Sequence, residues 1–358
     1  MGVFRENGYI YFMSSQTFII SRTDAIGDVV LTLPVAGVLR SLYPSSRIVF
    51  LGRSYTRDII KTCEFVDEFL NWDEIRQLSE QEGARVLAAV NANTIIHVLP
   101  HAQIAKLAKM AGIKQRIGTT NRLYHWVTCN RLVKLSRKNS PWHEAQLNLQ
   151  LLSSLGAKSL YTLKEISGLY GLTRLSPLQE PFVSLPDPAK FNLILHPKSR
   201  GHGREWGLDN FMRLIEILPA DEFKIFVTGG EEEGKLLQPM LHKYPFLTDL
   251  TGKMTLPQFI TFISSVDGLV ASGTGPLHLA AALGINALGI FPPIRPMHPG
   301  RWAPVGVRAK TFVLDKSCEA CRQSGDCACI RAVQPLQLKI WLQSLLRKGH
   351  LHPAGTRK

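Results

Sequence analysis

The chain alternates short apolar runs with helical segments, and it does so in two separate series. The first series begins at Thr17–Ser21 and the second at Leu193–His196. Between them, residues 158–188 lose the pattern and gather the prolines Pro177, Pro181, Pro186 and Pro188. Strands that alternate with helices form parallel sheets covered by those helices, and a proline-rich stretch is typical of a linker. The sequence therefore predicts an α/β protein with two Rossmann-like domains that face each other across a cleft.

The periodicity also predicts the individual elements of each series. For the first series we expect strands at Thr17–Ser21, Arg47–Leu51, Thr94–Leu99 and Arg116–Gly118, and helices at Val29–Leu42 and Trp142–Leu155. For the second we expect strands at Leu193–His196, Lys224–Thr228, Gly268–Ala271 and Ala287–Phe291, a short element at Thr248–Leu250, and helices at Leu208–Leu218, Glu231–Leu241, Leu256–Ser264 and Pro276–Leu283. Pro34 falls in the second turn of the helix at Val29–Leu42, where a proline is tolerated only near the start.

Length and hydropathy fit this division. A chain of 358 residues is longer than one hydrophobic core usually becomes, so we expect domains at 13–175 and 190–358. No run approaches the roughly 20 apolar residues that span a bilayer. The first 12 residues are a poor signal peptide, and we interpret them as a disordered extension or a misassigned start. The expected location is the cytoplasm.

One turn in the second series is built almost entirely from small residues. The sequence Val270-Ala271-Ser272-Gly273-Thr274-Gly275-Pro276-Leu277-His278 predicts a buried strand, a tight turn and an apolar helix. Thr274 suits the N-cap, and Pro276 suits the first turn. Such a helix start exposes backbone N–H groups and the positive end of the helix dipole, which together bind phosphate well. An ordinary strand-to-helix turn also needs small residues, so this stretch alone leaves both interpretations open.

Asp28 follows a glycine at the start of the first helix. A carboxylate in that place can act as a general base that removes a proton from a hydroxyl nucleophile. It can equally serve to stabilise the helix N-terminus, since Asp is common in first helical turns. The residue alone does not decide between these roles.

Two further turns of the second series carry charged groups. The segment His196–Trp206 contains Lys198, Ser199 and Arg204, which can surround a diphosphate or form a solvated basic loop. The turn at Thr228-Gly229-Gly230 leads into three glutamates. A carboxylate there can accept hydrogen bonds from a ribose, although first-turn stabilisation of the helix explains two of the three better.

Positive charge is concentrated in the first domain. Between His101 and Ser140 there are nine Lys or Arg residues and no acid, and the whole chain carries a net charge of +14. Such a region attracts polyanions, namely nucleic acid, acidic lipid headgroups or an acidic glycan, although it can also be a solvated face. Arg53, Arg57 and Lys61 recur at intervals of four, which predicts three cations on one helical face.

Four cysteines lie close together near the C-terminus, at Cys318, Cys321, Cys327 and Cys329. Without a secretory signal, a disulfide framework is not expected. Structural zinc usually binds two pairs of the C-x₂₋₄-C type, and the second pair here is a tighter C-x-C. We therefore expect no bound metal and no cofactor.

Together these motifs resemble the bacterial ADP-heptose:lipopolysaccharide heptosyltransferases, glycosyltransferase family 9, nearly from end to end. Arg22–Pro34 matches the family's R-x-[small]-x-G-D pattern, and Arg116-Ile117-Gly118 and His143-Glu144 are familiar from it, as is the N-x-x-L-L-type run that ends at Gly156. The second series adds a P-x-S…[KR]-x-W loop, a G-G-x-x-E turn, Leu250–Leu256 and the small-residue turn, where the family reads D-T-G-P-x-H-L-A-A-A-L-G. A cysteine-rich stretch near the C-terminus is also common in the family.

The resemblance implies a GT-B fold, with an acceptor-binding N-terminal domain, a nucleotide-sugar-binding C-terminal domain and an inverting transfer of heptose from ADP-heptose. It implies that Asp28 is the base and that the donor is bound by Lys198, Ser199, Arg204, Glu233, Met254, Thr274, Gly275 and His278. Glu233 would contact the ribose and Met254 would lie near the base, while His278 would support the phosphate loop. Arg53, Arg57 and Lys61 would face an acidic lipopolysaccharide core acceptor, which suits a protein peripheral on the inner membrane.

Two residues depart from the family pattern. Gly273 stands where the family has an Asp, and Arg204 stands where it has a phosphate-contacting Lys, a change that keeps the charge. The missing Asp supports an alternative, a non-catalytic or altered-donor protein of the same fold that binds sugar nucleotides or glycans. Nucleic acid is not an expected partner, because the cations lack the interleaved aromatic side chains of a stacking platform.

Overall fold

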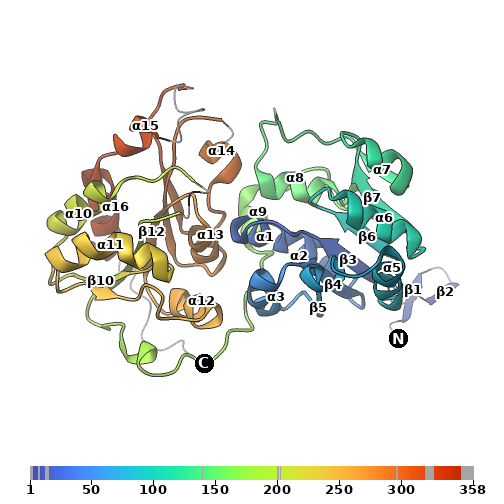
Figure 1. Cartoon of the computed structure of the whole chain (residues 1–358), viewed down its shortest axis with the longest axis horizontal. Helices are drawn as coiled ribbons and strands as arrows, with labels where there is room; N and C mark the ends of the chain where they lie inside the picture. Colours follow the sequence, from blue (N-terminus) through green and yellow to red (C-terminus); the bar gives the residue numbers. More distant parts are fainter. Residues whose placement is uncertain are drawn as a thin grey trace. The chain divides into compact units, whose positions relative to one another are not determined.

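A computed structural model describes residues 3–6, 9–12, 16–138, 140–199, 201, 203–295, 297–318 and 326–347. The chain divides into two compact units, Met1–Arg174 and Leu175–Lys358, which are seen in Figure 1. Each unit contains a six-stranded parallel sheet with helices on it. The predicted α/β class with two Rossmann-like domains is therefore confirmed.

The sheet of the N-terminal unit has the strand order β5-β4-β3-β6-β7-β8. Its strands are β3 Thr17–Ser21, β4 Arg47–Gly52, β5 Glu68–Asn71, β6 Thr94–His97, β7 Gln115–Thr119 and β8 Arg131–Val133. A separate antiparallel hairpin, β1 Val3–Glu6 and β2 Tyr9–Phe12, lies within the segment that we interpreted as a disordered extension or misassigned start. Because the first strand of the parallel sheet is central, the chain reverses its direction of winding between β3 and β6.

The helices of this unit are α1 Ile26–Val30, α2 Leu33–Leu42, α3 Arg57–Thr62, α4 Trp72–Ile75, α5 Glu80–Ala89, α6 Ala102–Met110, α7 Leu123–Thr128, α8 Glu144–Gln150 and α9 Leu163–Ser167, with the 3₁₀ turns η1 Ser54–Thr56 and η2 Ser153–Leu155. The single helix predicted at Val29–Leu42 is wrong, because the structure has two helices that are separated at Leu31 and Thr32. Proline lacks an N–H group and clashes with the preceding turn. The break places Pro34 in the first turn of α2, where neither effect is costly.

The helix predicted at Trp142–Leu155 is also shorter in the structure. His143 caps the start of α8 through its Nδ1 atom, which accepts a hydrogen bond from the Ala145 N–H over 3.2 Å. After Gln150 the chain tightens into a turn and then η2, and it leaves through Gly156 with a φ of 89°. Glycine adopts this left-handed conformation without the steric cost that other residues meet, which ends the helical segment.

The C-terminal unit repeats the same topology, with the strand order β11-β10-β9-β12-β13-β14. Its strands are β9 Phe191–His196, β10 Phe223–Val227, β11 Thr248–Asp249, β12 Gly268–Ser272, β13 Asn286–Ile290 and β14 Ala309–Phe312. Its helices are α10 Leu208–Ile217, α11 Glu231–Lys243, α12 Leu256–Ser264, α13 Gly275–Ala282, α14 Pro299–Trp302, α15 Ala328–Arg331 and α16 Pro335–Arg347, with the 3₁₀ turn η3 Phe182–Ser184. The bounds of α12 are those that the sequence predicted.

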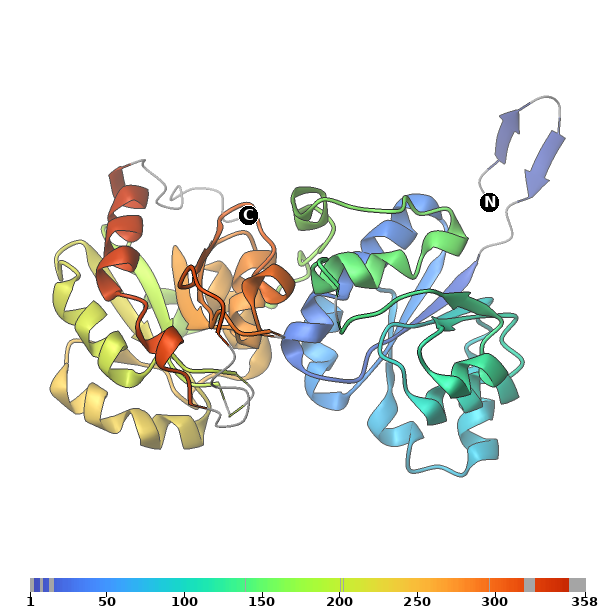
Figure 2. The same ribbon diagram turned by 90° about the horizontal axis from the view of Figure 1, so that it is seen from above.

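The core of the C-terminal unit lies between its sheet and the helices α10, α11 and α16. Helices α10 and α16 pack against each other, as both views show (Figures 1 and 2). Strands β9 and β12 are buried along their whole lengths, as a parallel sheet with helices on both faces requires. Because β9 and β12 are neighbours, the loops that follow them meet at one edge of the sheet. Ligands of such sheets bind at this edge, where the winding direction reverses.

Candidate functional site

Asp28 lies in the first turn of α1, just after the central strand β3 of the N-terminal unit. Its carboxylate Oδ1 accepts a short hydrogen bond from Nη2 of Arg22, and about 20% of the Asp28 side chain is exposed. Arg22 also donates from Nε to Asp24 over 2.6 Å. The structure thus gives Asp28 a charged partner in addition to the positive end of the α1 dipole.

The surroundings of Asp28 raise the pKa of its carboxyl from 3.8 to about 6. Burial has the largest effect, because it disfavours the charged form, and the nearby carboxylates of Asp24 and Glu144 act in the same direction. Arg22 opposes them and keeps the pKa from rising further. A carboxylate with a pKa near 6 is still largely ionised at neutral pH, and it is a stronger base than an ordinary aspartate.

A buried network holds Arg22 in place. Glu144, at the start of α8, is 1% exposed and accepts from Nη1 of Arg22 over 3.2 Å and from Nε of Arg137 over 2.9 Å. Arg137 donates in addition to the Oδ1 atom of Asn148 over 2.8 Å. Asn148 then donates to the carbonyl of Leu31, at the break between α1 and α2, over 3.0 Å. The network therefore fixes both the carboxylate and the helix that carries it.

The sequence motifs did not indicate Arg22 and Glu144 as members of this site, and Arg137 was counted only among the cations between His101 and Ser140. The placement of Arg137 is corrected by its contacts, because it is bound to Glu144, Asn148 and the Val98 carbonyl. The available signal was the motif match itself, since both Arg22 and His143-Glu144 belong to the motifs that carried the resemblance. Their contact joins residues 122 positions apart, which local pattern cannot reveal.

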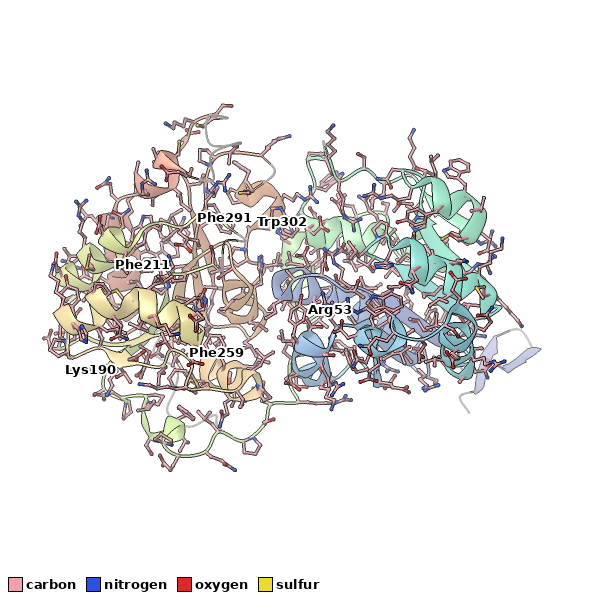
Figure 3. The ribbon with its side chains drawn as sticks, viewed as in Figure 1. Arg53, Lys190, Phe211, Phe259, Phe291 and Trp302 are labelled. Atoms are coloured by element: carbon pink, nitrogen blue, oxygen red, sulfur yellow. The ribbon has the colours of Figure 1, made fainter. Side chains whose placement is uncertain are left out.

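The three predicted acceptor cations are not on one helical face. Arg53, labelled in Figure 3, is extended and precedes η1, so α3 carries Arg57 and Lys61 but not Arg53. Arg53 donates to Asp73 over 3.0 Å and lies over the ring of Tyr55. The helix fails to reach back to Arg53 because the Asp73 carboxylate also accepts the Ser54 N–H over 2.9 Å, which holds the chain in the η1 turn.

These cations therefore have different surroundings. Tyr55 donates to the Asp24 carbonyl over 2.6 Å, which links Arg53 to the loop that carries Asp24 and Asp28. Arg57 instead contacts the Glu74 carboxylate at 3.6 Å. Lys61 is exposed farther along α3. The structure brings Arg53 to the candidate site, while the other two cations lie on the surface beyond it.

In the C-terminal unit, Lys198 and Ser199 follow β9 and are organised by a carboxylate that sequence analysis missed. Glu205 accepts from Nζ of Lys198 over 2.5 Å, from the Ser199 N–H over 3.0 Å and from Oγ of Ser199 over 3.1 Å. Trp206 is fully buried beside it and donates its backbone N–H to Oγ of Ser272 over 3.2 Å. The loop after β9 is thus tied to the end of β12. Arg200 and His202 of this loop lie outside the described residues.

The small-residue turn after β12 forms as predicted, with Thr274 as the N-cap of α13 and a proline in its first turn. The Thr274 side chain makes no capping hydrogen bond, and its Oγ1 atom is buried without a partner among the described residues. A Cβ atom at Gly203 would lie 3.3 Å from the carbonyl oxygen of Gly273, so the two loops touch. His278 is buried in the second turn of α13. The turn and the Lys198 loop therefore form one surface rich in donors.

Gly273 has a structural counterpart in Phe291, which lies just after β13 and is labelled in Figure 3. A Cβ atom at Gly273 would lie 2.8 Å from Cε1 of Phe291, and one at Gly289 would lie 2.6 Å from Cε2 of the same ring. The ring is 2% exposed. Phe291 thus packs against two glycines, and any side chain at position 273 would displace it.

The remaining donor candidates lie on the neighbouring loops. Glu233 is buried in the first turn of α11, and its Oε2 atom accepts the Gly230 N–H over 2.7 Å. This contact is the helix-stabilising role that the sequence left open. Met254 is half-buried just before the N-cap of α12, and the Gly252 N–H donates to the Gly229 carbonyl over 3.0 Å. The loops after β10 and β11 are therefore adjacent.

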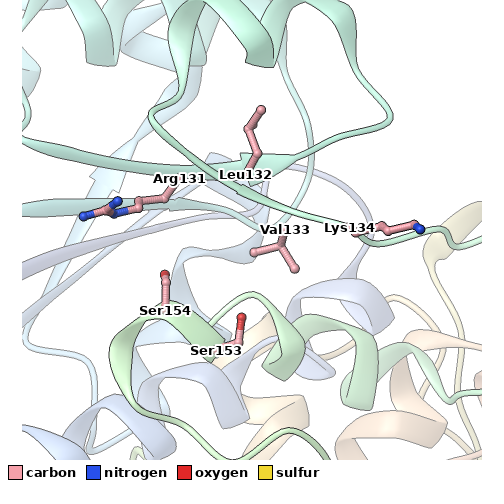
Figure 4. A pocket seen from close by; sticks show the side chains of 6 residues that line it. All are labelled: Arg131, Leu132, Val133, Lys134, Ser153 and Ser154. Carbon is pink, nitrogen blue, oxygen red and sulfur yellow. The ribbon is translucent and has the colours of Figure 1, made fainter.

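The described residues offer few other chemical possibilities. Within that part of the chain, no three His, Cys, Asp or Glu side chains lie close enough to hold a metal ion. Cys327 and Cys329 are buried in the apolar core of the C-terminal unit, while Cys321 lies outside the described residues. A hollow of about 350 Å³ in the N-terminal unit is lined by Arg131, Leu132, Val133, Lys134, Ser153 and Ser154 (Figure 4). It offers cations and hydroxyls but no carboxylate that could act as a base.

Sequence comparison identifies the family. Residues 82–329, well over half of the chain, match the family described as "Glycosyltransferase family 9 (heptosyltransferase)". The chain belongs to glycosyltransferase family 9. It is accordingly a glycosyltransferase. An Escherichia coli protein named lipopolysaccharide heptosyltransferase 3 is 22% identical over 282 residues, which is 74% of this chain and 80% of that protein.

Solved structures show the same fold. The E. coli ADP-heptose LPS heptosyltransferase II is 16% identical with a TM-score of 0.71, and the alignment covers 93% of this chain and 99% of that one. The E. coli heptosyltransferase WaaC, solved with ADP, is 17% identical with a TM-score of 0.68, and the alignment covers 92% and 99% of the two chains. The GT-B fold of this family 9 glycosyltransferase is thereby confirmed.

The residues that match the family include the donor candidates but not Asp28. All of the candidate donor residues lie inside the matched range, whereas Asp28 and Arg22 lie outside it. In the described part of the chain, no helix is both long and apolar enough to span a bilayer.

Proposed function

We propose that this chain is an inverting glycosyltransferase that transfers a heptose, or a related sugar, from ADP-heptose to an acidic lipopolysaccharide core acceptor at the cytoplasmic membrane surface. The named relatives act on lipopolysaccharide or are solved with ADP. The N-terminal unit would bind the acceptor, and the C-terminal unit would bind the sugar nucleotide. No metal or cofactor is required.

The environment of Asp28 is the observation that carries this proposal. Inverting transfer needs one base, because the acceptor hydroxyl must lose its proton as its oxygen bonds to the anomeric carbon. In the same step the bond from that carbon to the diphosphate breaks, and ADP leaves with the electron pair. Asp28 is partly exposed, held by Arg22 and has a pKa of about 6, so at neutral pH its carboxylate can receive this proton.

The C-terminal unit supplies what the leaving diphosphate needs. Lys198, Ser199 and Arg204 carry cationic or hydroxyl donors, and the start of α13 adds backbone N–H groups at Thr274 and Gly275. Glu233 would accept from the ribose, Met254 would lie against the adenine, and His278 would support the phosphate turn. Arg53 would meet an anionic group of the acceptor, because it lies beside the loop of Asp28.

Replacement of the base tests the mechanism. Asp28→Asn keeps the shape of the side chain but cannot take the proton, so we expect kcat to fall by about 10²- to 10⁴-fold. ADP affinity, measured by calorimetry, should stay within about twofold of the wild-type value, since the donor residues lie in the other unit. In the wild type, kcat/KM should fall on the acid side of pH 6 as Asp28 becomes protonated.

Asp24→Asn is the matched control. Asp24 is also bonded to Arg22 and is similarly exposed, so this variant perturbs the network without removing the base. We expect it to retain more than a tenth of the wild-type kcat. A fully active Asp28→Asn, or an Asp24→Asn as inactive as Asp28→Asn, would contradict the assignment of Asp28.

The packing of Gly273 and Phe291 favours a second candidate, an altered donor or a binding protein without transfer activity. The apolar ring occupies the space beside a position where the family has a carboxylate, so position 273 offers the donor no side-chain hydrogen bond. A thermal-shift screen with ADP, UDP and GDP separates the candidates. Selective stabilisation by ADP supports the proposed function. A preference for UDP or GDP indicates another donor, and ADP binding without transfer to lipopolysaccharide acceptors indicates the binding protein.

A further inference from the structure

Helix α7 buries polar side chains and exposes apolar ones, which is the reverse of the usual arrangement. His125 and Thr128 are buried, whereas Leu123, Trp126 and Val127 are 89%, 61% and 66% exposed. These three residues have the spacing i, i+3, i+4, so they lie on one face of the helix. A surface helix of a globular domain normally turns its apolar stripe toward the core. The outward face of α7 is therefore fitted to something other than water.

Hydrogen bonds and close packing hold the buried side of α7 in place, so the reversed arrangement is part of the fold. The Thr119 N–H donates to Nδ1 of His125 over 2.9 Å, and Oγ1 of Thr128 donates to the Tyr124 carbonyl over 2.6 Å. Gly118 on β7 leaves room for the imidazole, because a Cβ atom there would lie 2.7 Å from its Nδ1 atom. Figure 1 shows α7 beside α6 and β7, and the Lys109 ammonium of α6 donates to the Val127 carbonyl over 2.9 Å.

The Trp126 side chain is suited to an apolar environment. Its indole N–H donates to the Thr120 carbonyl over 3.0 Å. The ring can therefore move from water into an apolar environment without leaving this N–H unpaired. Tryptophan is enriched where a protein meets the headgroup region of a bilayer. A further exposed apolar side chain of this part of the surface, Met110, ends the neighbouring helix α6.

Exposed cations are frequent in the stretch of chain that carries this face, and that stretch contains no acid. Lys109, Lys114, Arg122 and Arg131 are exposed, and residues 101–140 contain no Asp or Glu. Lys106 is set apart from them, because its charge is paired with Glu80 of α5. Apolar side chains with Trp at the centre and a basic rim match the headgroup and acyl boundary of an anionic bilayer. A folded nucleic acid would meet the cations but leave the apolar residues in water.

We propose that α7 docks this enzyme on an anionic lipid bilayer. Leu123, Trp126 and Val127 enter the headgroup region, while Lys109 and Arg122 contact lipid phosphates. The inference deepens the proposed function and rests on it for the membrane-borne acceptor. It adds the element of the chain that contacts the membrane, which lies outside the candidate catalytic and donor residues.

Vesicle sedimentation of the full chain tests this proposal. We expect binding to vesicles of phosphatidylglycerol and phosphatidylcholine, and much weaker binding to phosphatidylcholine alone. Leu123→Asp with Val127→Asp should lower the partition coefficient on the order of tenfold or more, since two apolar groups no longer leave water. Arg122→Gln should lower it about fivefold, and only with the anionic vesicles.

The matched control is Leu336→Asp with Ile340→Asp on α16, two apolar residues of similar exposure, 56% and 61%, in the C-terminal unit. This variant should bind vesicles as the wild type does. Circular dichroism and thermal midpoints check that both variants fold. Wild-type binding by the α7 variant, or no vesicle binding by the wild type, overturns the proposal. If the α7 variant instead changes the molar mass in light scattering, the face is a self-interface and the proposal also fails.

Transfer assays separate this inference from the proposed function. The α7 variant should transfer sugar to a delipidated, soluble acceptor at the wild-type rate, because its substitutions are not among the candidate catalytic and donor residues. Asp28→Asn should bind vesicles normally while transfer is lost. An active Asp28→Asn would remove the proposed base but leave the vesicle result standing.

Discussion

The two units have the same strand order, yet the edges where their winding reverses differ in charge. After β3, the carboxylates Asp24, Asp28 and Glu144 surround one buried guanidinium, Arg22. After β9 and β12, the loops present small residues and cations, with Glu205 as the carboxylate that organises them. The topology determines where a ligand binds, and the side chains determine which ligand it is. One edge suits proton removal, and the other suits a diphosphate.

The two edges also differ in how deeply their charged side chains are buried. Arg22 and Glu144 are almost completely buried, whereas Lys198 and Glu205 are each about a quarter exposed. Buried charges depend on their partners, because a lost partner leaves an uncompensated charge in a poorly solvated place. Exposed charges can exchange partners with water or ligand at little cost. We therefore expect the N-terminal site to be rigid and the C-terminal loop to rearrange around its ligand.

Loss of the central guanidinium should have the largest effect. Arg22→Met leaves the buried Glu144 carboxylate with one cationic partner fewer and leaves Asp28 without one, so we expect a loss of about 3–5 kcal/mol in the free energy of unfolding. Urea denaturation followed by circular dichroism measures this change. The surviving folded protein should also need a higher pH for transfer, because Arg22 lowers the pKa of Asp28.

Arg47→Met is the control for this prediction. Its ion pair with Glu68 is nearly half exposed on both sides, so its loss should change the free energy of unfolding by less than about 1 kcal/mol. Equal losses in the two variants would show that burial does not distinguish the two pairs. The difference in burial between the two networks would then not affect the free energy of unfolding.

A smaller effect is expected at the cationic edge. Lys198→Ala removes a charged donor near the start of the proposed diphosphate site, and hydrogen bonds to charged groups contribute about 1.5–3 kcal/mol. The Kd for ADP should therefore rise about tenfold to a hundredfold, as measured by calorimetry. Stability should change little, because Lys198 is partly solvated.

Lys190→Ala provides the matched control in the same unit. Lys190, labelled in Figure 3, is paired with the Ala220 carbonyl at the opposite end of the sheet, before β9 begins. Its loss should leave ADP affinity unchanged. A similar loss of affinity in both variants would indicate general attraction by positive charge, without a site at Lys198.

Most of the fold could be predicted from the sequence, because apolar runs and turn residues act locally. The bounds of α12 and the turn at Thr274–Gly275 are examples. The start of α2 was placed wrongly, because Pro34 indicates a helix boundary but not its exact place, and Asn148, which donates to the Leu31 carbonyl, lies far along the chain. Arg53 was assigned to a helix because spacing alone does not reveal the contact of Ser54 with Asp73.

The candidate site was predicted in part for the same reason. Asp28 and the donor candidates stand in recognisable motifs next to strand ends. Arg22 and Glu144 also stand in the matched motifs, but their role as organising partners, like that of Glu205, was not assigned because a charged residue shows its partner only after the chain folds. The exposed face of α7 was also hidden, since Leu123, Trp126 and Val127 are residues that sequence analysis expects in a core.

The smallest expected effect concerns the stability of the acidic edge as a function of pH. The pKa of Asp28 is about 6 in the folded protein, against an ordinary value of 3.8. Between these values the folded protein binds a proton that the unfolded chain releases. The contribution of this carboxyl to stability is therefore greatest below a pH of about 4 and is lost as the pH rises to about 6.

Asp28→Asn cannot lose a proton, so its stability relative to the wild type should increase from pH 4.5 to pH 7.5. The gain stays smaller than the change in Arg22→Met, because the pKa of about 6 already includes the opposing effect of Arg22 and only the part of the shift above pH 4.5 contributes. Urea midpoints of both proteins at the two pH values measure the difference. A relative stability that is the same at both pH values, or lower at pH 7.5, would mean that Arg22 outweighs the burial of the carboxylate. The N-terminal edge would then resemble the C-terminal one, with charges compensated before substrate binds.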